Sequence, residues 1–160
     1  MSVTENDIAE VSRQLGRPAR GILEVASRCA CQRPLVVKTG PRLDDGTPFP
    51  TLYYLTQPAA TAAISGLEAT GFMVEMQELL ASDDEVLAEY QAAHRSYLAE
   101  RDAIEEVPEL VDFSAGGMPV RVKCLHALVA HSLAKGKGTN PIGDRALAAL
   151  EWSPAVCTCV

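Results

Sequence analysis

Two Cys-x-Cys pairs constrain the fold of this chain more than any other feature of the sequence. Cys29 and Cys31 stand in RCACQRP, and Cys157 and Cys159 stand in PAVCTCV, so most of the 160 residues lie between the pairs. Four thiolates are the ligand number of a closed tetrahedral zinc site, and the same set can hold an iron–sulfur cluster. We expect zinc rather than iron–sulfur. One shared metal would require the C-terminal tail to fold back onto the first pair.

The alternative is that the four thiols have no common role and that the C-terminal residues fray. Two residues at i and i+2 of a strand point to the same side, which favours the shared site. Cys124 is a fifth thiol that can replace one of the four. The first residues, MSVTENDIAE, lack the basic-then-apolar order of a signal peptide. We therefore expect a cytoplasmic protein with free thiols rather than disulfides.

The pattern of apolar residues predicts an α+β fold in which a small antiparallel three-stranded sheet packs against several helices. Branched and aromatic residues predict strands over 22–27, 34–39 and 51–55. Capping residues, prolines and glycines predict helices elsewhere, over 4–16, 58–71, 74–80, 83–104, 119–136 and from 141 onwards. The second half is therefore mostly helical. The length fits a single domain over 1–160.

The charge distribution excludes some partners and suggests others. A net charge of −7 argues against non-specific nucleic-acid binding, and no apolar run is long enough for a membrane span. Segments 13–42 and 113–145 are basic, whereas 75–112 holds twelve acids. The two basic segments could converge on a small anionic ligand. The alternatives are that the acidic helix 83–106 is solvated and pairs with the basic groups, or that it docks a basic protein partner.

RVKCLHALVAH, residues 121–131, carries the candidate catalytic side chains. If the helix starts at Pro119, Cys124 and His131 share one side and His126 lies on the edge of the apolar stripe. A direct Cys–His pair within this helix is then not expected, and the HExxH metal motif is absent. Each of the three side chains is either a nucleophile or acid–base group, or an ordinary core residue.

Basic residues near this motif predict an anion-binding pocket. The glycines of SAGGMP can expose backbone N–H groups to an anion. A metal-free enzyme acting on a phosphorylated or carboxylated small molecule would need one pocket where 38–42, 121–126 and 140–144 meet. Its predicted ligand-binding residues are Lys38, Arg42, Arg121, Lys123 and Asp144, the last orienting a histidine.

Three long motifs resemble one known family. KTGPRLDDGTPFPTLYYLTQP, SAGGMPVRVKCLHALVAHSLAKG and NPIGD look like the actinobacterial family known as domain-of-unknown-function 501. The resemblance covers about residues 10–150 and leaves 151–160 as a C-terminal tail, whose CTCV is not part of the family pattern. It implies a small cytosolic protein without an established activity. The matching positions are Lys38, Thr39, Arg42, Tyr53, Tyr54, Lys123, Cys124, His126, His131, Asn140, Pro141, Gly143 and Asp144.

Overall fold

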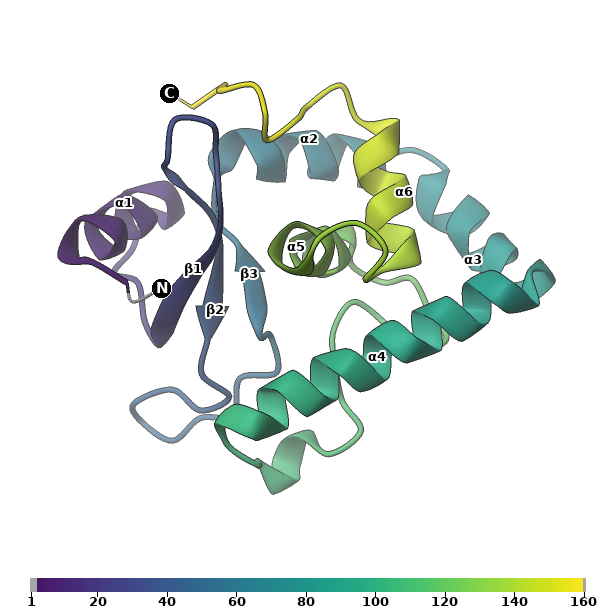
Figure 1. Ribbon diagram of the computed structural model, residues 1–160, viewed down its shortest axis with the longest axis horizontal. Coiled ribbons are helices and arrows are strands. Elements are labelled where there is room, and N and C mark those ends of the chain that lie inside the picture. The colour runs from purple at the N-terminus through teal and green to yellow at the C-terminus, as the bar shows by residue number, and fades with distance from the viewer. Residues whose placement is uncertain (1–2, 160) are drawn as a thin grey trace.

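The sheet of this protein lies between helices on both of its faces (Figure 1). The computed structural model describes residues 3–159. Strands β1 (Ile22–Arg28), β2 (Pro34–Thr39) and β3 (Tyr53–Leu55) pair antiparallel in the order β1-β2-β3. The α+β class and the three antiparallel strands are as the sequence predicts, although β3 begins at Tyr53 instead of residue 51.

Helices make up most of the remaining chain. They are α1 (Glu5–Leu15), α2 (Pro58–Glu68), α3 (Phe72–Ser82), α4 (Asp84–Ile104), the 3-10 helix η1 (Pro108–Leu110), α5 (Leu125–Lys135) and α6 (Pro141–Ala149). Side-chain caps fix several of their starts, as at Thr4, Asp83 and Asn140. No helix within residues 3–159 has both the length and the apolar character that a membrane crossing requires.

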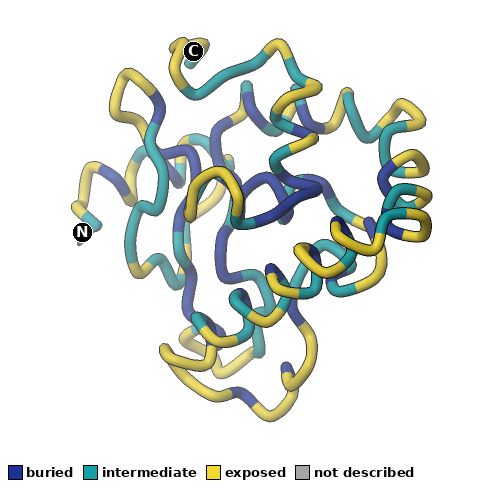
Figure 2. The backbone as a smooth tube through the Cα atoms, turned by 45° about the vertical axis from the view of Figure 1, so that its right-hand side comes forward, coloured by how far each residue is buried: buried dark blue, intermediate teal, exposed yellow. Residues whose placement is uncertain are grey.

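Helix α5 forms the centre of the core. It packs against β3 on one side and against α6 on the other, while α1 covers the opposite face of the sheet (Figure 1). The first turns of α5 and the whole of β2 are largely buried, whereas the outer side of α4 is exposed (Figure 2). One cluster of buried side chains joins the sheet to α2, α3, α4, α5 and α6.

The predicted start of α5 is wrong by six residues. Gly116 and Gly117 have φ of +68° and +97°, a region that glycine enters without steric cost. The chain therefore turns back on itself, and the carbonyl of Gly116 accepts hydrogen bonds from the N–H groups of Lys123 (2.8 Å) and Cys124 (3.3 Å). Residues 119–124 are a loop, and Cys124 is the N-cap of the helix instead of lying inside it.

Helix α4 turns one face into the core along most of its length. Tyr90 and Tyr97 are fully buried, but Ile104 at its C-terminal end is 37% exposed. Arg101 takes the inward position instead. Its guanidinium donates hydrogen bonds to the carbonyls of Pro50 (3.0 Å) and Leu110 (2.8 Å), so a buried charge holds two loops against the helix.

Candidate functional site

The two Cys-x-Cys pairs form one cluster. The Sγ atoms of Cys29, Cys31, Cys157 and Cys159 all lie within 4.8 Å of one another, and those of Cys31 and Cys159 are 3.6 Å apart. Figure 1 shows the C-terminal end of the chain beside the turn between β1 and β2. The tail therefore returns to the first pair, as a shared site requires, and the four sulfurs are close enough to hold a metal ion.

A tight turn gathers the first pair. The N–H of Cys29 bonds to the carbonyl of Arg33, and the N–H of Gln32 bonds to the carbonyl of Cys29, both at 2.8 Å. Gln32 has a φ of +75°, which lets the chain reverse within these few residues. The N–H of Ala30 then bonds to the carbonyl of Pro154 at 3.1 Å. The hairpin thus presents both of its sulfurs to the tail.

The surroundings of the cluster favour negative charge on the sulfur of Cys31 and oppose it on that of Cys159. The Nε2 of Gln57 donates a hydrogen bond of 2.8 Å to the Sγ of Cys159, and a guanidinium nitrogen of Arg33 lies 4.0 Å from the Sγ of Cys31. The backbone N–H of Arg33 is the largest cause that lowers the pKa of Cys31 to about 6. Burial, followed by the neighbouring Cys31, raises the pKa of Cys159 to about 12. Without a cation, thiolates this close oppose one another.

A second cluster lies at the start of α5. Ligand atoms of Glu68, Cys124 and His126 are within 4.8 Å of one another. Glu68 ends α2, and one of its carboxylate oxygens accepts a 2.9 Å hydrogen bond from the N–H of Leu125. The other oxygen lies 3.3 Å from the Nδ1 of His126. One carboxylate therefore caps the helix and orients the imidazole.

Charges in this second cluster stabilise a thiolate beside an imidazolium. His126 is the largest cause that lowers the pKa of the Cys124 thiol, against burial, and the N–H of Ala127 lowers it further. Cys124 in turn raises the pKa of His126, with Glu68 adding to the effect. The Nε2 of His126 lies 3.3 Å from the carbonyl of Thr61, so both ring nitrogens have an acceptor nearby. That arrangement suits a doubly protonated ring.

His131 lies in the core, away from this pair. Its side chain is fully buried, stacks on the ring of Tyr53 with centroids 6.0 Å apart, and meets the ring of Tyr97 edge-on at 5.2 Å. Asn140 lies 3.3 Å from its Nδ1, whereas its Nε2 has no hydrogen-bond partner among residues 3–159. Burial lowers the pKa of His131 to about 4, which keeps the ring neutral. These contacts favour the core interpretation of this histidine.

None of the main hollows found within residues 3–159 is lined by all three of the segments predicted to form one anion pocket. Arg121 and Lys123 line a hollow of about 370 Å³ together with Cys124. Asp144 lines a different hollow, and its carboxylate accepts a 2.8 Å hydrogen bond from the N–H of Gly138. The hydrogen bonds of Asp144 within residues 3–159 include none to a histidine of the α5 motif, although its charge acts on His131.

The other two predicted anion ligands face acidic or aromatic neighbours. Lys38 pairs across the sheet with Glu24 on one side and Tyr53 on the other. Arg42 contacts Glu105 at 3.2 Å and Glu109 at 2.9 Å. The two Arg42 ion pairs support the interpretation that basic groups neutralise part of the acidic segment. Docking of a protein partner by helix 83–106 stays a prediction.

Sequence reasoning missed three side chains of these clusters. Gln57 and Arg33 contact sulfur, and Glu68 binds His126, yet none of them belongs to a recognisable motif. The RCACQRP segment contains Arg33, so a cation next to the first pair was the one available signal. Gln57 and Glu68 come from opposite ends of α2, and only the packing of that helix brings them to the two clusters.

Comparison with known proteins gives a family match. Residues 25–148 match the family model described as "Protein of unknown function (DUF501)". The matched residues include the first Cys pair and the whole Glu68–Cys124–His126 cluster, whereas the second Cys pair follows them. No curated protein and no solved structure matches the chain.

Proposed function

The chain belongs to the DUF501 family, and we propose that it is a zinc-binding protein whose four cysteines hold one ion. The observation that carries the proposal is the clustering of four sulfurs, from Cys29 and Cys31 and from Cys157 and Cys159, within 4.8 Å. Tetrahedral zinc with Zn–S bonds of ~2.3 Å sets its sulfurs ~3.8 Å apart. The spacing in the cluster is compatible with that geometry before any rearrangement.

The neighbouring side chains are those that a zinc–thiolate centre needs. Four thiolates around Zn²⁺ leave a net charge of −2, which nearby cations and hydrogen-bond donors stabilise. Arg33 lies beside Cys31, and Gln57 donates to Cys159. Glu10 binds Arg33 at 3.5 Å and Arg13 at 2.6 Å, which ties α1 to the same site.

We assign the zinc a structural role. A site with four protein ligands leaves no position for substrate. The tail after α6 has no regular secondary structure, although Leu150 and Trp152 pack against the core. A metal at the cluster would hold this tail to the β1–β2 hairpin and close a loop over most of the chain.

Metal analysis of purified protein tests this proposal. We expect about one zinc per chain by mass spectrometry, on protein purified without a metal-affinity step. Cys31→Ser and Cys159→Ser should each lose it, and Cys124→Ser is the matched control that should keep it. Iron in place of zinc would assign the cluster to an iron–sulfur centre. Protein without metal, or with a Cys31–Cys159 disulfide, would refute the zinc site.

The second cluster favours an additional role as a thiol-dependent enzyme. Cys124 has the features of an activated nucleophile: it caps a helix, His126 lies beside it, and Glu68 orients the histidine. Arg121 and Lys123 are exposed and line the hollow next to Cys124. The substrate class that suits these charges is a small molecule that carries a phosphate or carboxylate next to an electrophilic carbon.

Alkylation with two matched reagents tests this second role. Iodoacetate is anionic and iodoacetamide is neutral, and both attach to a thiolate. We expect the rate of iodoacetate divided by that of iodoacetamide at Cys124 to fall in an Arg121→Ala, Lys123→Ala double variant. The reason is that the local positive charge favours the anionic reagent. Arg95→Ala, which removes an exposed arginine on α4, should leave the ratio unchanged. A ratio equal in all three proteins would contradict recognition of an anion at Cys124.

A further inference from the structure

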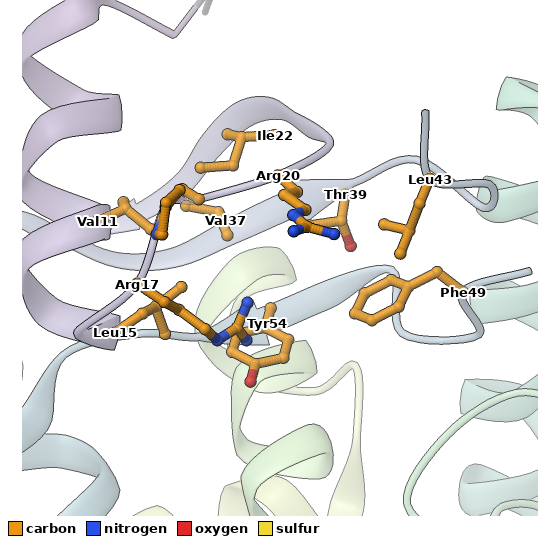
Figure 3. A pocket seen from close by; sticks show the side chains of 12 residues that line it. Val11, Leu15, Arg17, Arg20, Ile22, Val37, Thr39, Leu43, Phe49 and Tyr54 are labelled. Atoms are coloured by element: carbon orange, nitrogen blue, oxygen red, sulfur yellow. The ribbon is translucent and has the colours of Figure 1, made fainter. Parts of the chain in front are cut away.

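A third region, which shares no residue with either cysteine cluster, forms a hollow with the features of a ligand site. It lies between α1, the sheet and two loops, with a volume of about 170 Å³ (Figure 3). Its lining comes from the end of α1, the loop 16–21, all three strands and the loop 40–50. Neither the zinc proposal nor the role of Cys124 depends on it.

The inner wall of the hollow is apolar and partly aromatic. Val11 and Val37 form fully buried parts of the wall, and the rings of Phe49 and Tyr54 stack with centroids 6.3 Å apart at an interplanar angle of 27°. Figure 3 shows Leu43 beside Phe49 on the same side of the hollow. Such a surface favours a flat apolar group, because ring faces and branched side chains exclude water from it.

Two arginines give the rim of the hollow its charge. Arg17 and Arg20 are both exposed and both line it, and Figure 3 shows their guanidinium groups among the lining side chains. No carboxylate belongs to the lining that residues 3–159 provide. The ion pairs found within residues 3–159 engage other arginines, such as Arg28 with Asp7, but neither Arg17 nor Arg20.

Asp45 is an acid within electrostatic range of the rim. The carboxyl of Asp45 has a lowered pKa, mainly because Thr47 donates hydrogen bonds to it, and Arg20 contributes a smaller effect. Asp45 is exposed and its carboxylate accepts from the N–H of Thr47 at 3.0 Å, so it is held by its own turn. Among the ion pairs found within residues 3–159, none joins the guanidinium of Arg17 to a carboxylate.

We infer that this hollow binds a small aromatic anion, a single ring carrying a carboxylate or a phosphate. A cavity of about 150 Å³ lined by aliphatic and aromatic side chains accommodates benzene, so the size fits one ring. Guanidinium groups bind carboxylate and phosphate through paired hydrogen bonds. The ring lies against Phe49 and Tyr54, and the anionic group lies at the rim between Arg17 and Arg20. The hydroxyl of Tyr54 is a further donor on the lining.

Binding of four small probes to the full metal-containing chain tests this inference. The probes are benzoate, phenyl phosphate, benzyl alcohol and inorganic phosphate, and the readouts are the dissociation constant and the backbone amide shifts in ¹H–¹⁵N NMR spectra. We expect benzoate or phenyl phosphate to bind at least tenfold more tightly than benzyl alcohol or inorganic phosphate. The shifted amides should lie at Val37, Thr39 and Leu43.

Variants separate the site from general charge attraction. An Arg17→Ala, Arg20→Ala double variant should weaken the aromatic anion at least tenfold, whereas Arg95→Ala, an exposed arginine of α4, should not change it. Equal binding of benzyl alcohol would overturn the inference in favour of a plain apolar cavity. Equal binding of inorganic phosphate, or no binding of either aromatic anion, would also overturn it. A metal-free Cys31→Ser protein that still binds the aromatic anion separates this result from the zinc proposal.

Discussion

Gln57 binds Cys159 through one end of its side-chain amide and caps α2 with the other. Its Nε2 donates to the sulfur at 2.8 Å, and its Oε1 accepts from the N–H of Ala60 at 3.1 Å. The side chain is 1% exposed, so neither bond competes with solvent. A single buried amide thus connects the thiolate cluster with the helix whose other end carries Glu68.

Gln57→Ala should weaken both the N-terminal cap of α2 and the proposed metal site. Loss of a side-chain N-cap costs about 1 kcal/mol, and loss of a hydrogen bond to a metal ligand lowers metal affinity by about 10-fold or more. We expect a lower free energy of unfolding and easier loss of zinc in a chelator competition. Gln77→Ala, whose amide donates to the carbonyl of Val120 at 2.9 Å away from the cysteines, is the control. It should not change zinc affinity, and an equal effect there would show that Gln57 has no special role.

Removal of the metal should lower the melting temperature of the native protein. Structural zinc contributes its binding free energy to folding, because the unfolded chain does not hold the four ligands together. With a strong chelator we expect a fall of at least about 5 °C, which corresponds to a destabilisation of ~1–2 kcal/mol at this size. Cys31→Ser should already melt at the lower temperature and show no further change. Differential scanning calorimetry measures both, and a chelator-insensitive native protein would argue against the zinc role.

The pH dependence of alkylation should differ between Cys124 and an ordinary thiol. Because the pKa of Cys124 is lowered, its thiolate persists at a pH where a free cysteine is protonated, and it is lost only as the pH falls through the lowered value. His126→Ala removes the main cause of the lowered pKa, so the rate of alkylation of Cys124 at pH 7 should fall by about tenfold. Peptide mapping after iodoacetamide treatment identifies the site. The same protein in guanidinium chloride gives the reference profile, and identical profiles would contradict the ion pair.

The ion pair between Asp7 and Arg28 should contribute stability that is lost in acid. Arg28 approaches the carboxylate at 2.9 Å and is the largest cause that lowers the pKa of Asp7 to about 2. The folded pKa lies below the unfolded value, so the contribution is complete above about pH 4 and is lost as the pH falls through about 2. Asp7→Asn should therefore cost about 2 kcal/mol at pH 7 and much less near pH 2.

Urea unfolding of metal-free Cys31→Ser protein measures this difference without a contribution from zinc loss in acid. Glu5→Gln, which changes an exposed acid of the same helix turn, is the control and should have little effect. A cost of Asp7→Asn that is the same at pH 7 and pH 2 would show that the ion pair does not account for it.

Gly143 permits a close approach of α6 to α5, and Gly143→Ala should be strongly destabilising. An added Cβ would lie 2.3 Å from the carbonyl oxygen of Leu128 and 2.3 Å from the Oγ of Ser132. Relieving that overlap requires the two helices to separate, at a cost of about 3 kcal/mol. Gly66→Ala is the matched control within α2, because an added Cβ there meets no atom within 4 Å. It should stabilise by about 0.5–1 kcal/mol, since alanine favours a helix over glycine.

Local patterns predicted most of the fold because each element carries its own start and stop signals. Strand β2 has the predicted bounds, since PLVVKT begins at a proline and is followed by a glycine. Asp83 caps α4, and Pro141 begins α6, as predicted. At α5 the same logic failed. Pro119 suits a first helical turn, but the preceding glycines bond to the loop after it. A rule based on helix caps recognises the proline as a helix start. It does not recognise the glycine turn that keeps the residues after the proline in a loop.

That one error also changed the predicted site. Projected on a helix from Pro119, Cys124 and His126 point to different sides, so a direct pair seemed excluded. As the N-cap, Cys124 adopts extended backbone angles, φ −146° and ψ 106°, and its thiol meets His126. The four-cysteine cluster was predictable because two Cys-x-Cys motifs are visible in the sequence itself. The Arg17–Arg20 rim was not, since only the fold brings these residues next to Phe49 and Tyr54.

The cysteine cluster also determines how the molecule would bear a mechanical load. With a metal bound, residues 32–156 form a closed ring between the two Cys pairs. A force that pulls the two ends apart then passes through α1, β1 and the metal, and bypasses the helices from α2 to α6. Those helices cannot extend until metal–thiolate bonds break. In a pulling experiment the native protein should therefore extend by a short length first, and Cys159→Ser should extend over its whole chain at lower force.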